Sequence, residues 1–454
     1  MEPQPRPVTP AAPPTIVGDR PPKPEPIDSE VLLLVEGKDS CNFFKHLWKE
    51  HLKLPDQLQM RSFSNVSELK EVLIGLPSAS GFGNVKVMGI IGDAEQSSAR
   101  AFQSVKESLK HAKLPVPVNP EQLSCGGQPA VGIMILPGQD QPGMLETLLC
   151  KIFADTPERY CIDAFFKYVK KQCPDSSVSN LDKARTRVFL VTKPKLCASV
   201  GVAAQKGYWD LDHEVLEPAH KFLQSLMEPQ PQPITPAVPP NIDLPPKPQP
   251  ITSEVLLLVE GKDSLNFFDA LWKHLKLSDQ LKIMNFGGVK QLKKFLIGLP
   301  SASGFGDVKV MGIIQDAEQS SIRTFQSVSA NLERAKLPVP TKPEQLSCDG
   351  QPAVGIMILP GQDQPGMLET LLCKIFADTP ERYCIDAFFR CVQEKCPDSS
   401  VSNPDKACAR AFLATKPKSY CSVGVAANEG YWNLDHEVLE PARKFLQSLA
   451  AAAD

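Results

Sequence analysis

The sequence predicts an α/β protein built from two tandem copies of one domain. Each copy is expected to hold a mostly parallel sheet flanked by helices, followed by a helical C-terminal part. The stretch Ser29–Ser40 returns unchanged as Ser253–Ser264. A longer stretch, Pro120–Phe166, returns as Pro343–Phe389 with a single change. Within each copy, short apolar runs alternate with amphipathic stretches, which is the pattern of βαβ units.

Two proline-rich stretches mark the domain boundaries. Twenty of the 44 prolines lie in Met1–Pro26 and Met227–Pro250. Proline fixes φ and removes a backbone donor, so we expect a disordered N-terminal segment and an extended, semi-rigid spacer. A ligand for a proline-recognition domain is the alternative. The predicted organisation is a segment at 1–28, the first copy at 29–226, a linker at 227–252 and the second copy at 253–449. Whether the two copies pair with each other stays open.

Three apolar runs of the first copy indicate buried strands of a parallel sheet. They are Val31–Val35, Val85–Ile91 and Ala130–Leu136, and Gln59–Phe63 is a shorter candidate. Amphipathic spacing predicts helices between and after them. The expected helices are one capped by Asp39 or Ser40 that contains Phe43, Phe44, Leu47 and Trp48, and others over Val66–Leu76, Ser98–His111, from Met144 onward, Tyr160–Val169 and Val215–Leu226.

Composition narrows the classes of protein to consider. The net charge of -3 argues against a protein that coats nucleic acid by positive charge alone. The 13 cysteines form no CxxC pair and no zinc-ligand spacing, so we expect small buried thiols in a reducing compartment. The sequence shows no secretory signal, and no apolar run approaches the ~18 residues that a membrane span needs. We therefore expect a cytoplasmic protein without membrane contact. The thiols expected to be buried include Cys150, Cys161, Cys373 and Cys384.

Carboxylates follow the predicted strands of the first copy. Glu36, Asp93 with Glu95, and Asp140 each come just after an apolar run. Ligands of parallel sheets bind at the carboxyl ends of the strands, so these acids are expected at one edge. Asp93 and Glu95 are two positions apart, so in an extended backbone their side chains point to the same side. Carboxylate oxygens suit Mg²⁺ or Mn²⁺. The predicted metal ligands are Glu36, Asp93 and Glu95 in the first copy and Glu260, Asp316 and Glu318 in the second.

These motifs resemble a known domain. The run Val-Glu-Gly-Lys-Asp at 35–39 is similar to the first motif of the toprim domain of topoisomerases, bacterial primases, overcoming-lysogenization-defect nucleases and the small maturase of 5S ribosomal RNA. Asp93-Ala94-Glu95 stands where that domain has Asp-x-Asp. With the segment Pro142–Glu146, the sequence most resembles toprim-like proteins catalogued as a domain of unknown function. The resemblance implies that Glu36 and Glu260 are the toprim glutamates. The sequence departs from the toprim pattern at two points. The second acid of the pair is Glu95 where toprim domains have Asp, and the glycine that often follows the pair is absent.

The resulting hypothesis is a Mg²⁺-dependent protein that handles phosphodiesters, first of all a nuclease acting on RNA or DNA. The candidate catalytic residues are Glu36, Glu260, Glu146 and Glu369. The alternative is a non-catalytic binding or regulatory module of the same shape, favoured by the near-neutral charge and the two departures. Nucleotidyl transfer, as in primases, is a third hypothesis, and the lack of a visible zinc-binding or helicase module counts against it.

Each candidate also has an ordinary structural interpretation. Asp93 and Glu95 could cap a helix, and Glu146 is favourable in a first helical turn by the dipole alone. Lys38 could hold a phosphate or lie on the surface. His213 could be a general base or a helix cap. A basic group could contact phosphates, although a solvated face is the default. Its members are Lys183, Arg185, Arg187, Lys193 and Lys195.

Overall fold

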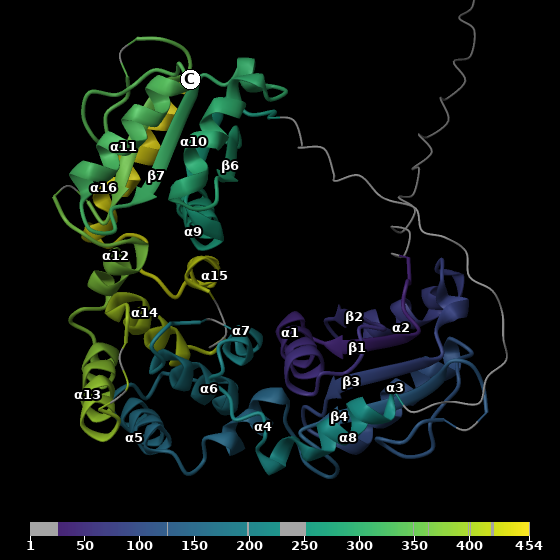
Figure 1. The fold of residues 1–454 in the computed structure, drawn as a ribbon. Helices are drawn as coiled ribbons and strands as arrows, with labels where there is room; N and C mark the ends of the chain where they lie inside the picture. Colours follow the sequence, from purple (N-terminus) through teal and green to yellow (C-terminus); the bar gives the residue numbers. More distant parts are fainter. Residues whose placement is uncertain are drawn as a thin grey trace, which may run out of the picture.

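In the computed structural model, residues 26–227 and 251–453 are described, apart from residues 125, 198, 348, 362, 398, 400 and 419–421. The predictions of an extended N-terminal segment and an extended linker fall on residues 1–25 and 228–250, outside the described ranges. The rest of the chain forms two halves of the same architecture (Figure 1).

Each half contains a four-stranded parallel sheet, as predicted. The strand order is β2-β1-β3-β4 in the first half and β6-β5-β7-β8 in the second, so the first strand lies in the interior of each sheet. The strands are β1 (Val31–Glu36), β2 (Leu58–Phe63), β3 (Val87–Asp93), β4 (Ala130–Leu136), β5 (Val255–Val259), β6 (Leu281–Asn285), β7 (Val310–Asp316) and β8 (Ala353–Leu359).

Helices connect and cover the strands. In the first half they are α1 (Lys38–His46), the π-helix η1 (Leu47–His51), α2 (Val66–Gly75), the short turns η2 (Leu76–Ser78) and η3 (Phe82–Asn84), α3 (Ser98–His111), α4 (Leu145–Ile152), α5 (Pro157–Gln172), α6 (Leu181–Val191), α7 (Val200–Gln205), η4 (Glu214–Leu216) and α8 (Glu217–Ser225). In the second half they are α9 (Gly261–His274), α10 (Val289–Gly298), η5 (Leu299–Ser301), η6 (Phe305–Asp307), α11 (Ser321–Arg334), α12 (Leu368–Ile375), α13 (Pro380–Lys395), α14 (Pro404–Ala414), α15 (Val423–Asn428), η7 (Glu437–Leu439) and α16 (Glu440–Ala453). Among these described helices, none has the length and apolar character that crossing a membrane requires.

Two apolar layers sandwich each sheet. On one face of the first sheet, α2 and α3 bury Leu69, Leu73 and Leu109. On the other face, α1 and α8 pack over the strands. A side chain at Gly89 of β3 would come within 2.9 Å of Leu226, just after α8. A glycine at this position therefore lets the last helix of the half lie directly on the sheet.

The start of α1 differs from the prediction. Neither Asp39 nor Ser40 caps this helix, because its N-cap is Gly37, with a φ of 82° that favours glycine. Asp39 lies inside the first turn instead. Its carboxylate accepts hydrogen bonds from the amides of Val200 (2.9 Å) and Gly201 (3.0 Å), at the start of α7. Asp39 therefore caps a different helix, α7, which begins 161 residues further along the chain and which local sequence cannot reveal as its partner.

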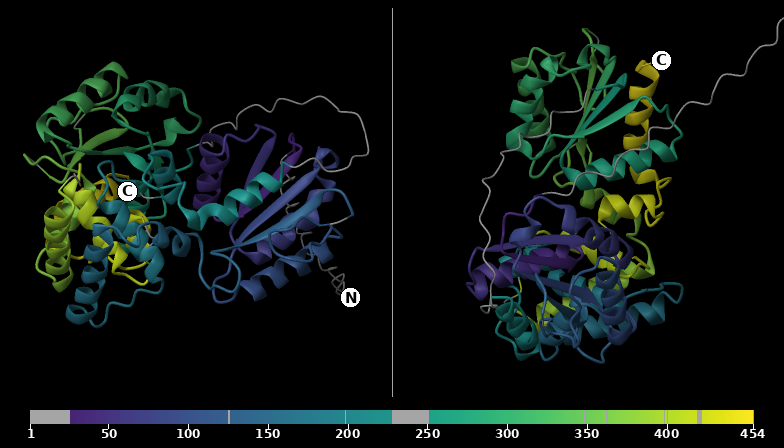
Figure 2. Two further views of the ribbon diagram at one scale, coloured as in Figure 1. Left: turned by 60° about the horizontal axis from the view of Figure 1, so that its bottom comes forward. Right: turned by 90° about the vertical axis from the view of Figure 1, so that its right-hand side faces the viewer.

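The two halves pair through their helical parts, while the two sheets lie apart (Figures 1 and 2). Helix α5 packs against α13, and the rings of Phe165 and Phe388 stand 5.3 Å apart across this interface. The contact is reciprocal. Ser176 donates to the carbonyl of Thr415, and Ser399, which is equivalent to Ser176, donates to the carbonyl of Thr192. The two copies thus form a pseudo-symmetric dimer within one chain.

All four named cysteines are buried, as predicted, but one of them is not a free thiol. Cys150, Cys373 and Cys384 are buried free thiols. Cys161, however, forms a disulfide with Cys391 across the α5–α13 interface, with Cα atoms 5.7 Å apart. The two residues are 230 positions apart, so only the pairing of the copies brings them together.

Candidate functional site

Two acids meet at the carboxyl ends of the central strands. Glu36 ends β1 and Asp93 ends the neighbouring strand β3. The backbone amide of Asp93 donates a hydrogen bond of 3.0 Å to Glu36 Oε2. The parallel arrangement thus brings these two predicted residues together. In the second half, Glu260 follows β5 and Asp316 ends β7 in the same way.

A third acid, Glu146, joins this pair from helix α4. Asp93 Oδ1 accepts a hydrogen bond of 3.3 Å from the amide of Leu145, the first residue of α4. This contact holds the first turn of α4 against the strand end, so that Glu146 follows directly. In the second half the amide of Leu368 donates to Asp316 Oδ1 at 3.0 Å, and Glu369 follows.

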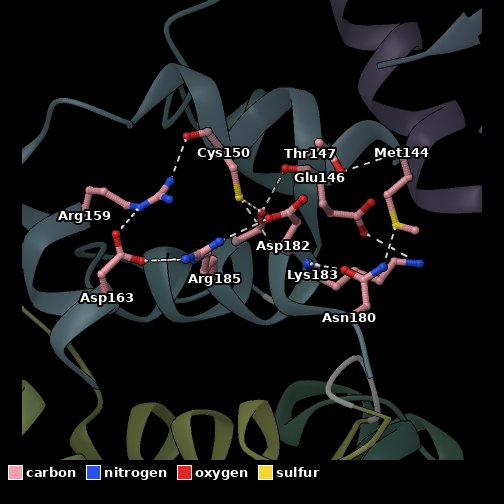
Figure 3. A network of polar contacts seen from close by, with 11 residues as sticks. Met144, Glu146, Thr147, Cys150, Arg159, Asp163, Asn180, Asp182, Lys183 and Arg185 are labelled. Carbon is pink, nitrogen blue, oxygen red and sulfur yellow. Dashed lines mark hydrogen bonds and ion pairs between the residues drawn. The ribbon is translucent and has the colours of Figure 1, made fainter. Parts of the chain in front are cut away.

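Helix α6 adds a cation to the group. Lys183 Nζ lies 4.0 Å from Glu146 Oε1, as Figure 3 shows, and the equivalent pair Lys406–Glu369 is separated by 3.8 Å. The Asn180 side chain caps α6 and also contacts the sulfur of Met144 at 3.5 Å. These contacts fix α6 beside the start of α4. Lys183 was predicted only as a member of a basic face, and the structure places it at the acidic site.

Burial is the main reason that the acids of the first half have raised pKa values, and like charges add to it. Burial raises the pKa of Asp93 well above its usual range, and the charges of Glu146 and Glu36 raise it further, while Lys183 opposes them. Burial also raises the pKa of Glu36, with Glu95 as the main like charge. The pKa of Glu146 is raised by burial and lowered by Lys183. We define this set of Glu36, Asp93, Glu95 and Glu146 as the acidic site.

The second half repeats this electrostatic pattern. Burial and then Glu369 raise the pKa of Asp316 to about 7. Burial raises the pKa of Glu260, and the charge of Glu318 adds to it. Glu369 has a raised pKa for the same reason, opposed by Lys406. A bound cation would favour the ionised forms of these acids, which burial now disfavours.

The orientation predicted for the acid pair is wrong. That orientation depends on an extended backbone through the second acid, whereas Glu95 has a φ of 51° and Glu318 a φ of 53°. The left-handed residue turns the chain after Asp93, and Glu95 exchanges two backbone hydrogen bonds of 2.8 Å with Gly143. Glu95 is exposed and influences Glu36 through its charge. Neither Asp93 nor Glu95 caps α3, because Ser97 does.

The donor set fits a hard divalent cation, which takes oxygen ligands. In the second half, Glu260 Oε2 is buried and accepts no hydrogen bond from the part of the chain that the structure describes. A cation would supply the partner that this oxygen lacks. As the side chains stand, no three His, Cys, Asp or Glu residues of the described ranges are close enough to enclose an ion. Binding would therefore need the acids to rotate toward each other.

Several other candidates have structural roles. Lys38 is exposed. His213 Nδ1 accepts a hydrogen bond of 3.3 Å from the amide of Val215 and so caps η4, the ordinary interpretation of this histidine. Asp140 does not join the acids and instead lines a cavity of about 180 Å³ together with Phe102 and Glu121.

The predicted basic face is mostly not a free solvated surface. Arg185 donates to Asp163 at 3.0 Å, and Arg159 pairs with the same carboxylate at 2.7 Å (Figure 3). Lys193 pairs with Glu158 at 3.1 Å and lies 3.8 Å from the centre of the Phe189 ring. These cations hold the helical part together. Arg187, in contrast, lowers the pKa of Glu146 and therefore belongs to the surroundings of the acidic site.

Comparison with known proteins identifies both halves. The model of a family described as "Protein of unknown function (DUF3226)" matches residues 30–228 and again residues 254–451. The two matches support two tandem copies of one domain in the chain. No curated protein and no solved structure matches the chain.

Proposed function

For this chain, which belongs to the DUF3226 family in both of its halves, we propose a Mg²⁺- or Mn²⁺-dependent reaction on phosphodiesters, first of all cleavage of RNA or DNA. One observation carries the proposal. Glu36, Asp93 and Glu146 come from three separate elements, and burial together with the charges of Glu146 and Glu36 raises the pKa of Asp93 at the edge where a parallel sheet binds ligands.

The resemblance to the toprim domain supports the same proposal. In both copies a glutamate follows the first strand and an acid ends the neighbouring strand β3 or β7. Those are the positions of the two toprim motifs. The second acid of the pair, Glu95 or Glu318, stands on a turned backbone, which is a further departure from a simple Asp-x-Asp strand end.

The residues of the acidic site have separable roles in this proposal. Glu36, Asp93 and Glu95 would hold the cation, which supplies charge stabilisation and a more acidic water when bound. Lys183 would contact a phosphate oxygen beside Glu146. Glu146, whose pKa is raised, would accept or donate a proton at the reacting oxygen. A cytoplasmic location and a nucleic-acid substrate stay predictions.

A non-catalytic binding module is the second candidate. It is favoured by the spacing of the acids, since no three of the described Asp, Glu, His and Cys side chains gather at ion-binding distance. The burial that raises the pKa of Asp93 also disfavours its ionised form. Such a module would bind nucleic acid without cutting it.

A cleavage assay distinguishes the two candidates. The full chain is incubated with RNA, single-stranded DNA and duplex DNA, with Mg²⁺ or Mn²⁺, and compared with the Glu36→Gln/Glu260→Gln variant. The proposal expects cleavage by the wild type and its loss in the variant. A matched control is Glu121→Gln/Glu344→Gln, which changes two partly buried acids outside the acidic site. If wild type and the first variant behave alike on every substrate, the nuclease proposal fails.

A further inference from the structure

One position at the strand ends differs between the two halves. Gly92 precedes Asp93 in β3, whereas Gln315 precedes Asp316 in β7. Val35 pairs with Ile91 in the first sheet, and the next residues along are Glu36 and Gly92. The same register in the second sheet sets Glu260 beside Gln315.

A side chain at this position points toward the toprim-like glutamate. A Cβ built on Gly92 would lie 3.4 Å from Glu36 Oε2. The equivalent residue of the second half carries a full side chain here, and Gln315 is only 3% exposed. The shared register therefore sets Gln315 beside Glu260 at the strand ends of the second sheet.

At this strand end, two buried oxygens of the second half lack a partner among the described residues. Gln315 Oε1 and Glu260 Oε2 are both inaccessible to solvent and accept no hydrogen bond there, although the backbone amides of Asp316 and Val289 act on the Glu260 carboxylate and lower its pKa. In the first half, Glu36 Oε2 accepts the 3.0 Å hydrogen bond from the amide of Asp93. Buried acceptors are rarely left unsatisfied, so two neighbouring ones indicate a group that would bind both.

We propose that the second half binds Mg²⁺ or Mn²⁺ through Gln315 Oε1 in addition to Glu260, and binds it more tightly than the first half. A carboxylate and an amide oxygen are both suitable ligands for a hard cation. The inference rests on the cofactor of the proposed function. With Gly92, the first half has one protein ligand fewer and leaves that position to water or a phosphate oxygen. The first half is then the better candidate for catalysis, and the second half is the one that holds its cation more tightly.

Binding of Mn²⁺ tests this directly, without an activity readout. The full chain is titrated with Mn²⁺, and the free ion is followed by electron paramagnetic resonance. We expect two sites whose affinities differ by about tenfold, since ligand number tunes affinity. Glu260→Gln should remove the tighter site, and Glu36→Gln the weaker one.

Variants at the differing position provide matched controls. Gln315→Met keeps the length of the side chain and removes its oxygen, so the tighter site should weaken about tenfold. Gly92→Gln should tighten the weaker site. Far-UV circular dichroism and thermal unfolding check that each variant is folded. If Gly92→Gln does not fold, Gln315→Met alone tests the role of the differing position.

The possible failures separate the two proposals. If two sites bind Mn²⁺ and Gln315→Met leaves both affinities unchanged, the role of Gln315 is wrong, while the metal-dependent function survives. Its amide would then donate to Glu260 instead of binding an ion. If the wild type binds no Mn²⁺ at all, this inference and the cofactor of the proposed function are both wrong.

Discussion

Asp316 accepts a hydrogen bond from the amide of Leu368 at 3.0 Å, which ties the end of a sheet strand to the first residue of helix α12. Asp93 makes the same contact with Leu145. In each half, one carboxylate thus joins the sheet to the helical part that follows it. The same carboxylate has a raised pKa, so the junction depends on its protonation state.

Stability should change with pH through Asp316. Its pKa rises from 3.8 in the unfolded chain to about 7 in the folded one. Between these values the folded state retains a proton that the unfolded state has lost, so the stability from this group is full below pH 3.8 and is lost as pH rises through 7. The free energy of unfolding of the wild type, relative to Asp316→Asn, should fall by up to roughly 4 kcal/mol from pH 4 to pH 8.

Urea unfolding at a series of pH values measures this difference. Asp316→Asn is a suitable reference because it stays neutral and keeps an oxygen for the amide of Leu368. The control is Asp307→Asn, which lies in the short turn η6 outside the acidic site. A pH-independent difference between wild type and Asp316→Asn would show that Asp316 ionises normally in the folded protein.

Gly201→Ala should destabilise the first half. A Cβ at this position would meet Asn42 Cβ at 2.5 Å and the backbone carbonyl oxygen of Asp39 at 2.9 Å. Backbone cannot move aside as a flexible side chain can, so we expect a loss of about 1–3 kcal/mol in the free energy of unfolding. Gly83→Ala is the control, because a Cβ there meets nothing within 4 Å. Equal denaturation midpoints for the two variants would contradict the close packing of α1 on α7.

The disulfide should hold the halves together covalently. With a protease site inserted in the linker, cleaved protein purified without reductant should run as one band in denaturing electrophoresis and as two after reduction. Cys173 and Cys384 also contact each other across the interface, so the experiment is done in a Cys173→Ser background. In that background Cys161→Ser should give two bands without reductant. Two bands before any change to Cys161 would mean that Cys161 and Cys391 are not bonded.

Phe165→Ala should loosen the pairing of the halves. Phe165 and Phe388 are each 2% exposed and contact each other across the α5–α13 interface. Truncation should cost about 3–5 kcal/mol and separate the unfolding of the two halves in calorimetry. Tyr168→Ala, on the same helix but 39% exposed, is the matched control. If Phe165→Ala unfolds in a transition as sharp as that of Tyr168→Ala and at as high a temperature, Phe165 does not contribute to the pairing of the halves.

Local patterns predicted most of the fold. Helix α3 and strand β4 have the predicted bounds, Ser98–His111 and Ala130–Leu136. Both carry strong local signals, a serine cap before the helix and a continuous apolar run in the strand. Strand β3 begins two residues later than predicted and extends to Asp93. Helices α6 and α7 were missed as separate elements, because the amphipathic pattern there is weak and α7, at Val200–Gln205, is short.

The acidic site was only partly predictable. Strand order and direction were enough to bring Glu36 and Asp93 together. The turned backbone at Glu95 follows from its hydrogen bonds to Gly143, a contact between segments far apart in the chain. Lys183 reaches the site through the packing of α6 on α4, which no local pattern encodes. Its basic character was visible in the sequence, but its partner was not.

The position of helix α8 has a consequence for synthesis of the chain. Leu226 packs on Gly89 in the middle of the first sheet, so that layer is incomplete until the end of the first half has left the ribosome. Leu449 packs on Gly312 in the same way, so the second sheet is also covered only once the last helix of its half, α16, has been made. In each half the sheet therefore waits for the segment that is synthesised last in that half.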